Sequence, residues 1–187
     1  PKLHISDWTA SQRMLMDHYK IKCWAAVVGG SLGGMQAMHW SVTYPDRLLS
    51  AVVIASAMKL SAQNIAFNEI ARRAIKEDTD FHGGRYQEKN KKPLRGLALA
   101  RMIGHVTYLS DLSMAEKFGR EVLSGDFCNE KLESVKFKIE SYLNYQGDKF
   151  ANGFDANSYI LLTKMLDYFD LAREYDNQPS SAFRVAT

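Results

Sequence analysis

The residues best suited to do chemistry lie in one glycine-rich turn around Ser31. The turn reads Val-Val-Gly-Gly-Ser-Leu-Gly-Gly-Met over residues 27–35 and follows an apolar stretch. Gly29 and Gly33 complete the pattern Gly-x-Ser-x-Gly, in which small residues two places either side of a serine let a strand and a helix approach closely. Such a turn holds the serine in a strained conformation with its hydroxyl exposed. This arrangement, a nucleophile elbow, indicates acyl or ester chemistry at Ser31.

Glycine-rich turns also bind phosphate, and two such turns can be compared with this one letter by letter. A dinucleotide-binding loop that began at Gly29 would need glycine in place of Ser31, and one that began at Gly30 would need it in place of Leu32. A P-loop would need Gly-Lys-Ser/Thr at residues 34–36, which are Gly-Met-Gln. Neither pattern fits. A turn that is rich in glycine for structural reasons alone remains the open alternative.

A serine nucleophile needs a base and a carboxylate that orients the base. In α/β folds that carry this elbow the base follows the serine in the chain, which leaves His82 and His105. The first lies in a glycine-rich loop and the second in the middle of a predicted helix, positions more typical of surface or packing histidines. His39 lies eight residues along the helix that follows Ser31, roughly 12 Å away by rise alone, and is excluded.

The developing oxyanion needs hydrogen-bond donors, and the backbone N–H of Leu32 is the first candidate. It opens a predicted helix, where N–H groups are unpaired and the helix dipole favours negative charge. The second donor is expected from an earlier strand loop. Only residues 1–20 precede the predicted strand, and we find no such loop in them.

The elements that must position Ser31 lie in the first part of the chain. Helix, strand, helix and strand are predicted in turn at residues 6–19, 21–28, 32–44 and 48–57. The last is a near-continuous apolar run of the kind buried in a parallel sheet. This alternation predicts a doubly wound α/β core. The first helix is expected to gather its larger side chains near one side at Trp8, Met14, Leu15 and His18.

Helical patterns continue from residue 58 to residue 170, and no strand is predicted there. Residues 61–75 and 96–109 are predicted helices. Two later helical patterns consist of Leu132, Val135, Ile139, Tyr142 and Leu143, and then of Tyr159, Leu162, Leu166 and Phe169, with Asp155 or Asn157 as the cap of the second. We interpret the region as an inserted helical cap.

The predicted helix at 96–109 has two distinct faces. One is apolar, with Leu99, Met102, Ile103, Val106 and Leu109. The other carries Arg101, Gly104, His105 and Tyr108 at the spacing i, i+3, i+4 and i+7. Arg101 and Tyr108 are therefore predicted to point the same way.

Composition narrows the class of protein. The 187 residues are 46% hydrophobic and 24% charged, which predicts one globular domain, or one domain with an insertion. The net charge of +3 is spread out, so no basic tract argues for nucleic acid. A cluster of Lys89, Lys91, Lys92 and Arg95 is interpreted as a solvated loop, with a role in holding a phosphorylated cofactor left open.

The cysteines and the hydropathy pattern predict the cellular location of the protein. Cys23 and Cys128 lie far apart without metal-type spacing, which predicts neither a metal site nor a disulfide framework and suits a reducing cytoplasm. Neither a signal peptide nor an apolar run of membrane-spanning length is found. A cytoplasmic protein without membrane association is expected.

Six segments, in the same order along the chain, resemble the homoserine O-acyltransferase family of α/β-hydrolase folds. They are residues 24–37, 59–69, 96–105, 117–120, 140–143 and 154–159. The resemblance implies the central portion of an α/β-hydrolase fold, a parallel sheet flanked by helices, with an inserted helical cap. Its implied boundaries are core at 1–57, cap at 58–170 and a return toward the core at 171–187.

The resemblance also implies a reaction. Ser31 would attack an acyl-CoA thioester and pass the acyl group to the hydroxyl of L-homoserine, an early step in methionine biosynthesis. Ser31 matches the family's nucleophile, Leu32 its oxyanion amide, and Arg101 and Tyr108 its substrate-binding cap residues. A guanidinium suits the homoserine carboxylate because it offers a two-pronged donor. Acetyl-CoA is the default donor and succinyl-CoA the alternative, with no bound cofactor or metal, and a homodimer through the cap is implied.

The departures from the family pattern are equally specific. The family's catalytic Asp and His lie in a segment that would follow Thr187, and its oxyanion loop would precede residue 1. We therefore expect the 187-residue chain alone to be inactive. A serine esterase or thioesterase and a non-catalytic module that pairs through its cap remain alternatives.

Overall fold

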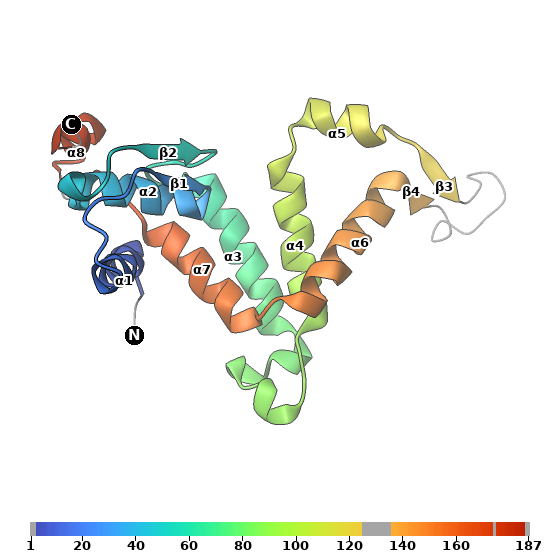
Figure 1. Ribbon diagram of the computed structural model, residues 1–187. Coiled ribbons are helices and arrows are strands. Elements are labelled where there is room, and N and C mark those ends of the chain that lie inside the picture. The colour runs from blue at the N-terminus through green and yellow to red at the C-terminus, as the bar shows by residue number, and fades with distance from the viewer. Residues whose placement is uncertain (1–2, 125–135, 174, 186–187) are drawn as a thin grey trace. The chain divides into compact units, whose positions relative to one another are not determined.

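The structure, a computed structural model, describes residues 3–124, 136–173 and 175–185 (Figure 1). The chain forms two compact units, which are described one at a time. Unit 1 comprises residues 1–65 and 161–187, and unit 2 comprises residues 66–160.

Unit 1 contains a parallel strand pair built around the glycine-rich turn. Strand β1 (Val27–Gly30) pairs with β2 (Ala51–Ile54), from Val27 opposite Ala51 to Gly30 opposite Ile54. The helix α2 (Leu32–Thr43) connects them and ends before Pro45, which opens the short 3₁₀ turn η1 (Pro45–Arg47). The predicted strand–helix–strand order is confirmed. Both strands are shorter than expected, because the preceding backbone makes only an isolated bridge, between Trp24 and Leu48.

The apolar run of β2 is not buried, contrary to expectation. All four of its residues are exposed, with Ile54 at 53%. Among the described residues the sheet has two strands, so β2 lacks a second neighbour. An apolar run therefore predicts a strand correctly without guaranteeing that its faces are covered.

The core of unit 1 forms around α2 and α1 (Ile5–His18). The side of α1 that carries Trp8, Met14 and Leu15 is exposed, and the buried residues of the helix are Ile5, Thr9 and Met16. The core cluster consists of Ile5, Met35, Met38, Val42, Met165, Leu171 and Ala182. Its last members come from α7 (Ala156–Tyr168), the segment after it and α8 (Pro179–Ala182), which is followed by η5 (Phe183–Val185).

Unit 2 is mainly helical. Its elements are α3 (Ala62–Glu77), which begins in unit 1, the 3₁₀ turns η2 (Thr79–Gly84) and η3 (Gln87–Lys89), and the helices α4 (Leu94–Tyr108), α5 (Asp111–Phe118) and α6 (Lys138–Gly153). Two short antiparallel strands, β3 (Val122–Ser124) and β4 (Lys136–Phe137), correct the expectation of no strand in this region. The predicted residues Leu132 and Val135 lie outside the described residues. Asp155 caps α7 as expected, its carboxylate accepting from the N–H of Ser158 at 2.7 Å.

Helix α4 packs through small residues and through only part of its predicted apolar face, where Ile103 lies against the core of unit 2. Leu99 and Val106 are 51% and 47% exposed, whereas the buried residues of α4 are Gly96, Leu97, Ala98 and Ala100. A Cβ on Gly96 would lie 2.5 Å from the carbonyl oxygen of Ala74 on α3. A Cβ on Gly147 of α6 would lie 3.1 Å from the carbonyl oxygen of Ala98. The backbone of α4 therefore approaches both neighbouring helices closely, and α4 and α6 lie side by side in Figure 1.

The described helices include none that combines the length and apolar character needed to cross a lipid bilayer.

We predict that Gly96→Ala destabilises unit 2 by about 1–3 kcal/mol, because the added methyl group collides with the α3 backbone and not with a flexible side chain. Gly153→Ala in α6 is the matched control, since a Cβ there meets nothing within 4 Å. Urea unfolding of both variants checks this. Equal midpoints for Gly96→Ala and the unsubstituted protein would show that α3 and α4 can separate at no cost.

Candidate functional site

Ser31 occupies the turn between β1 and α2 in a conformation that side chains rarely adopt. Its φ is 52° and its ψ is −117°. Its N–H donates to the carbonyl oxygen of Ile54 at 3.0 Å, and its own carbonyl oxygen accepts from the N–H of Met35 at 3.1 Å and from Oγ of Ser56 at 2.7 Å. The side chain is exposed. The backbone is thus fixed while the hydroxyl stays accessible, as the elbow requires.

The glycines around Ser31 do not contribute equally. A Cβ on Gly29 would lie 2.1 Å from the carbonyl oxygen of Gly33, and one on Gly34 would lie 2.5 Å from Cβ of Ser56. A Cβ on Gly33 would meet nothing within 4 Å. The close approach therefore requires Gly29 and Gly34, whereas the second glycine of the sequence pattern leaves open space.

Leu32 is the first residue of α2, and its side chain packs against the core of unit 1. Its backbone N–H lies in the first turn of the helix, where no intrahelical acceptor exists, and the positive end of the helix dipole is at the same place. The geometry suits an oxyanion near Ser31.

In unit 2, Arg101 and Tyr108 share a face of α4, as their spacing predicts. The guanidinium carbon of Arg101 lies 5.9 Å from the ring centroid of Tyr108 and 5.0 Å from that of Phe150 on α6. No carboxylate among the described residues pairs with Arg101. A half-buried guanidinium between two rings and without an ion pair is available to a carboxylate ligand.

Two tyrosines border this cation. Tyr108 is 69% exposed, and its hydroxyl would lie 3.4 Å from a Cβ on Gly104, so its side chain turns back along α4 toward the turn that carries Arg101. The other, Tyr159 of α7, is mostly buried, and this burial raises the pKa of Tyr159 to about 12. A neutral phenol beside Arg101 does not compete with a ligand for the guanidinium charge.

His105 lies between Arg101 and Tyr108 on the same face. Its Nδ1 lies 2.9 Å from the hydroxyl of Tyr142 on α6, and its Nε2 is buried without a hydrogen-bond partner among the described residues. Burial, then the charges of Arg101 and Lys117, lower the pKa of His105. The imidazole is therefore neutral near pH 7.

In the part of the chain that the structure describes, no carboxylate orients either of the two histidines considered as bases. His82 lies exposed in η2 with a φ of 49°. Neither it nor His105 makes a side-chain hydrogen bond to a carboxylate among the described residues. His39 of α2 instead contacts the hydroxyl of Thr9 at 2.9 Å.

Two lysines of the basic cluster, Lys91 and Lys92, have partners in the structure. Lys92 donates to the carbonyl oxygen of Asn152 at 2.8 Å, and Lys91 lies 3.6 Å from the carboxylate of Asp80. The cluster that the sequence suggested is thus partly anchored.

Cys23 is a free, exposed thiol, and Cys128 lies outside the described residues. Within the described ranges no group of three or more His, Cys, Asp or Glu side chains forms a metal site.

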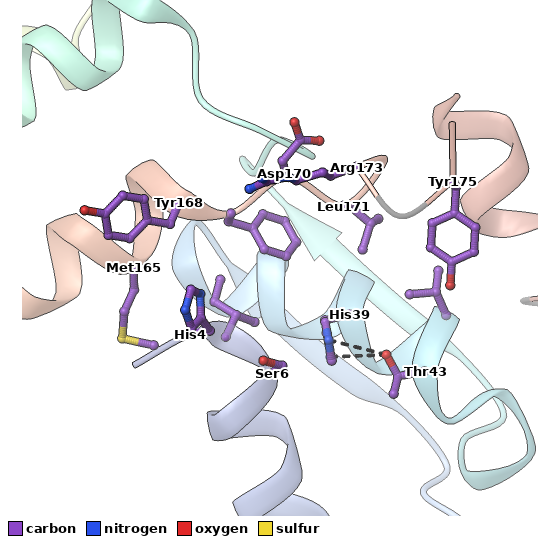
Figure 2. A pocket seen from close by; sticks show the side chains of 13 residues that line it. His4, Ser6, His39, Thr43, Met165, Tyr168, Asp170, Leu171, Arg173 and Tyr175 are labelled. Carbon is purple, nitrogen blue, oxygen red and sulfur yellow. Dashed lines mark hydrogen bonds between the residues drawn. The ribbon is translucent and has the colours of Figure 1, made fainter. Parts of the chain in front are cut away.

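Unit 1 also contains a cavity of about 720 Å³ between α1, α2 and the end of α7 (Figure 2). Its lining includes His4, His39, Thr43, Tyr168 and Arg173, and neither Ser31 nor Leu32 contributes to it. The hydrogen-bond distance between Thr43 and the His39 ring is 3.4 Å. This cavity is therefore separate from the elbow.

Sequence reasoning missed two contributors to these sites. Ser56 follows β2, and because carboxyl ends of parallel strands meet at one edge, its place beside Ser31 could have been anticipated. Tyr142 was predicted only as part of a helical apolar pattern, and nothing in its spacing points to His105.

Residues 2–171 match the family model described as the alpha/beta hydrolase fold. The chain belongs to this family. The α/β-hydrolase fold is known for a nucleophile at the strand–helix turn, which is the position of Ser31.

Curated relatives confirm the narrower resemblance. A homoserine O-succinyltransferase of Cellvibrio japonicus is 63% identical over 186 residues, which is 100% of this chain and 49% of the relative. One of Teredinibacter turnerae is 60% identical over the same shares. The chain spans about half the length of the curated relatives it matches.

A solved structure gives the same fold. A homoserine O-acetyltransferase from Bacillus anthracis superposes with a TM-score of 0.85 at 24% identity, over 97% of this chain and 48% of that one. Esterase E22 superposes with a TM-score of 0.76 at 26% identity, over 90% of this chain and 46% of that one. The α/β-hydrolase fold thus hosts both acyl transfer and ester hydrolysis among these proteins.

We predict that Gly29→Ala disrupts the elbow and that Gly33→Ala does not, although both glycines belong to the same sequence pattern. The reason is the 2.1 Å approach that a Cβ on Gly29 would make, against open space at Gly33. Labelling of Ser31 by a fluorophosphonate probe, measured by mass spectrometry on the complete gene product, checks this. Equal labelling of the two variants would mean that the turn does not depend on this contact.

We predict that the His105 imidazole titrates below its usual pKa of 6.5, because the buried ring is flanked by the cations Arg101 and Lys117 and by the phenols Tyr108 and Tyr142. Since the unfolded state then binds more protons, stability falls as the pH drops through 6.5 toward the lowered pKa. NMR titration measures the midpoint, with His105→Asn to assign the signal. A midpoint above 6.5 contradicts the prediction.

Proposed function

We propose that the complete gene product is a homoserine O-acyltransferase that uses succinyl-CoA. The observation that carries the proposal is the conformation of Ser31, whose backbone is fixed at φ 52° while its hydroxyl is exposed. The names of the curated relatives, at 60–63% identity, support the acceptor and the donor. On their support we propose succinyl-CoA in place of the acetyl-CoA default expected from the sequence.

In the first step, the Ser31 hydroxyl attacks the thioester carbonyl carbon. The proton of the hydroxyl passes to a base, the carbon–sulfur bond breaks, and CoA leaves as a thiol after receiving a proton. The N–H of Leu32 at the start of α2 donates to the oxyanion. Because His82 and His105 lack an orienting carboxylate among the described residues, we propose that neither is the base.

In the second step, the homoserine hydroxyl attacks the acyl-serine ester, and Ser31 regains its proton. We assign Arg101 to the carboxylate of homoserine, because it lies between two rings without an ion pair in the part of the chain that the structure describes. Tyr108 supplies a hydroxyl beside it on the same face.

Ester hydrolysis is the second candidate function, and the similarity to esterase E22 favours it. A hydrolase would use water where a transferase uses an alcohol. Both reactions share the acylation of Ser31, so the fate of the acyl group separates them.

A cytoplasmic location and a homodimer formed through unit 2 stay predictions, and analytical ultracentrifugation tests the latter.

The test uses the complete gene product with succinyl-CoA and acetyl-CoA, followed by intact mass spectrometry. We expect a succinyl adduct on Ser31, its transfer to L-homoserine, and no adduct in Ser31→Ala. Arg101→Ala should acylate at a rate close to that of the unsubstituted protein but transfer at least tenfold more slowly, since an unpaired substrate carboxylate loses a charge-assisted bond.

Three outcomes would contradict parts of this proposal. Release of free succinate with or without homoserine would favour hydrolysis. A block of acylation alone in Arg101→Ala would mean that Arg101 acts on the donor. Acylation by acetyl-CoA but not by succinyl-CoA would restore the acetyl donor.

A further inference from the structure

A chain of side-chain contacts runs from α6 to the guanidinium of Arg101. It starts at Tyr142, whose hydroxyl lies 2.9 Å from Nδ1 of His105 and whose ring meets the imidazole edge-on at 5.4 Å and 87°. The imidazole contacts the ring of Tyr108 at 6.0 Å, and that ring lies 5.9 Å from the guanidinium carbon of Arg101. All four residues belong to unit 2, and three of them share one face of α4.

The start of this chain of contacts is itself held in place. The ring of Phe118 at the end of α5 lies 4.8 Å from that of Tyr142, and the ammonium of Lys117 lies 5.1 Å from the same ring. Tyr142 therefore has an apolar contact on α5 and a polar contact on α4. His105 thus links Tyr142 of α6 to Tyr108, in addition to the direct contact between Phe150 of α6 and Arg101.

The outer face of α4 needs such support. Tyr108 is 69% exposed and lies in the last turn of α4, where little backbone packing restrains it. Arg101 lies against two aromatic rings and has no ion pair among the described residues. Ordering a long cationic side chain at the moment of binding costs rotamer entropy, and prior ordering removes this cost from the affinity for a ligand.

The imidazole suits this role because it is uncharged. A carboxylate in its place would pair with Arg101 and occupy the guanidinium, whereas a cation would add to the charges of Arg101 and Lys117. A neutral ring that hydrogen-bonds to Tyr142 fixes the geometry and leaves the charge of Arg101 free for a substrate carboxylate.

We propose that His105, hydrogen-bonded to Tyr142, is a positioning residue that orders Tyr108 and Arg101 for the carboxylate of the acyl acceptor. The inference rests on the proposed function, and it adds two residues that act before the acceptor binds. Neither residue takes part in bond making. Their effect is confined to the second half of the reaction, because only that half uses the acceptor.

The experiment compares both half-reactions in the complete gene product. CoA release from succinyl-CoA without homoserine measures acylation, and kcat/KM for homoserine measures transfer. We expect His105→Phe and Tyr142→Phe each to lower kcat/KM for homoserine roughly tenfold, the upper range for one hydrogen bond, while acylation changes less than twofold. The double variant should be no worse than either single variant, because both remove the same interaction.

Two further variants separate positioning from general destabilisation. His105→Asn keeps a hydrogen-bonding group near the place of Nδ1 and should recover most of the transfer rate. Tyr145→Phe is the matched control, since Tyr145 lies on the same helix, is 61% exposed and contacts only Lys149 among the ring contacts described. It should leave both half-reactions unchanged.

Each remaining result overturns the inference. Equal losses in acylation and transfer would mean a structural role, and so would losses that follow the melting temperatures of the variants. If both Phe variants change kcat/KM for homoserine less than twofold, the hydrogen bond between Tyr142 and His105 does not affect transfer. The same conclusion follows if His105→Asn transfers no faster than His105→Phe. If the unsubstituted protein acylates Ser31 but never transfers to homoserine, the proposed function fails and the inference with it; transfer that is insensitive to the variants defeats the inference alone.

Discussion

The close approach of two backbone segments at Gly29 is the constraint on which the candidate site of unit 1 depends. The carbonyl oxygen of Gly33 occupies the space of a side chain on Gly29, so β1 can turn directly into α2 only with glycine at this position. This tight turn forces Ser31 to adopt a positive φ. One steric condition therefore fixes three things: the strain, the exposure of the hydroxyl and the placement of the first amides of α2 beside it.

A similar condition acts in unit 2. Helix α4 contacts α3 and α6 through Gly96 and through Ala98 opposite Gly147, where backbone and small side chains leave no room for larger ones. Such contacts fix the rotation of a helix about its axis more strictly than large flexible side chains do. The rotation of α4 then decides that Arg101 and His105 face rings on α6, while Tyr108 stays exposed at the end of the helix.

The polar groups around Ser31 differ in kind from those on α4, and each set suits its part of the proposed chemistry. Among the described residues, the hydrogen-bond partners of Ser31 are backbone groups and the hydroxyl of Ser56, which suits a site where negative charge develops and disappears. On α4 the polarity is that of a permanent cation among rings and a neutral imidazole. A fixed cation suits a permanent substrate carboxylate, because no reorganisation is needed when it binds.

The sequence by itself determined the elbow, the parallel strand pair and the shared face of Arg101 and Tyr108. Each depends on residues close together in the chain, where turn geometry and helical spacing leave few choices. The tertiary structure alone decided how much of the predicted apolar face of α4 is covered, because hydrophobic periodicity gives Ile103, which packs against the core, the same weight as the exposed Leu99 and Val106. It alone decided the exposure of β2 and the pairing of Tyr142 with His105, which lie 37 residues apart. Such contacts follow from how separate elements pack, and no local pattern in one chain encodes that packing.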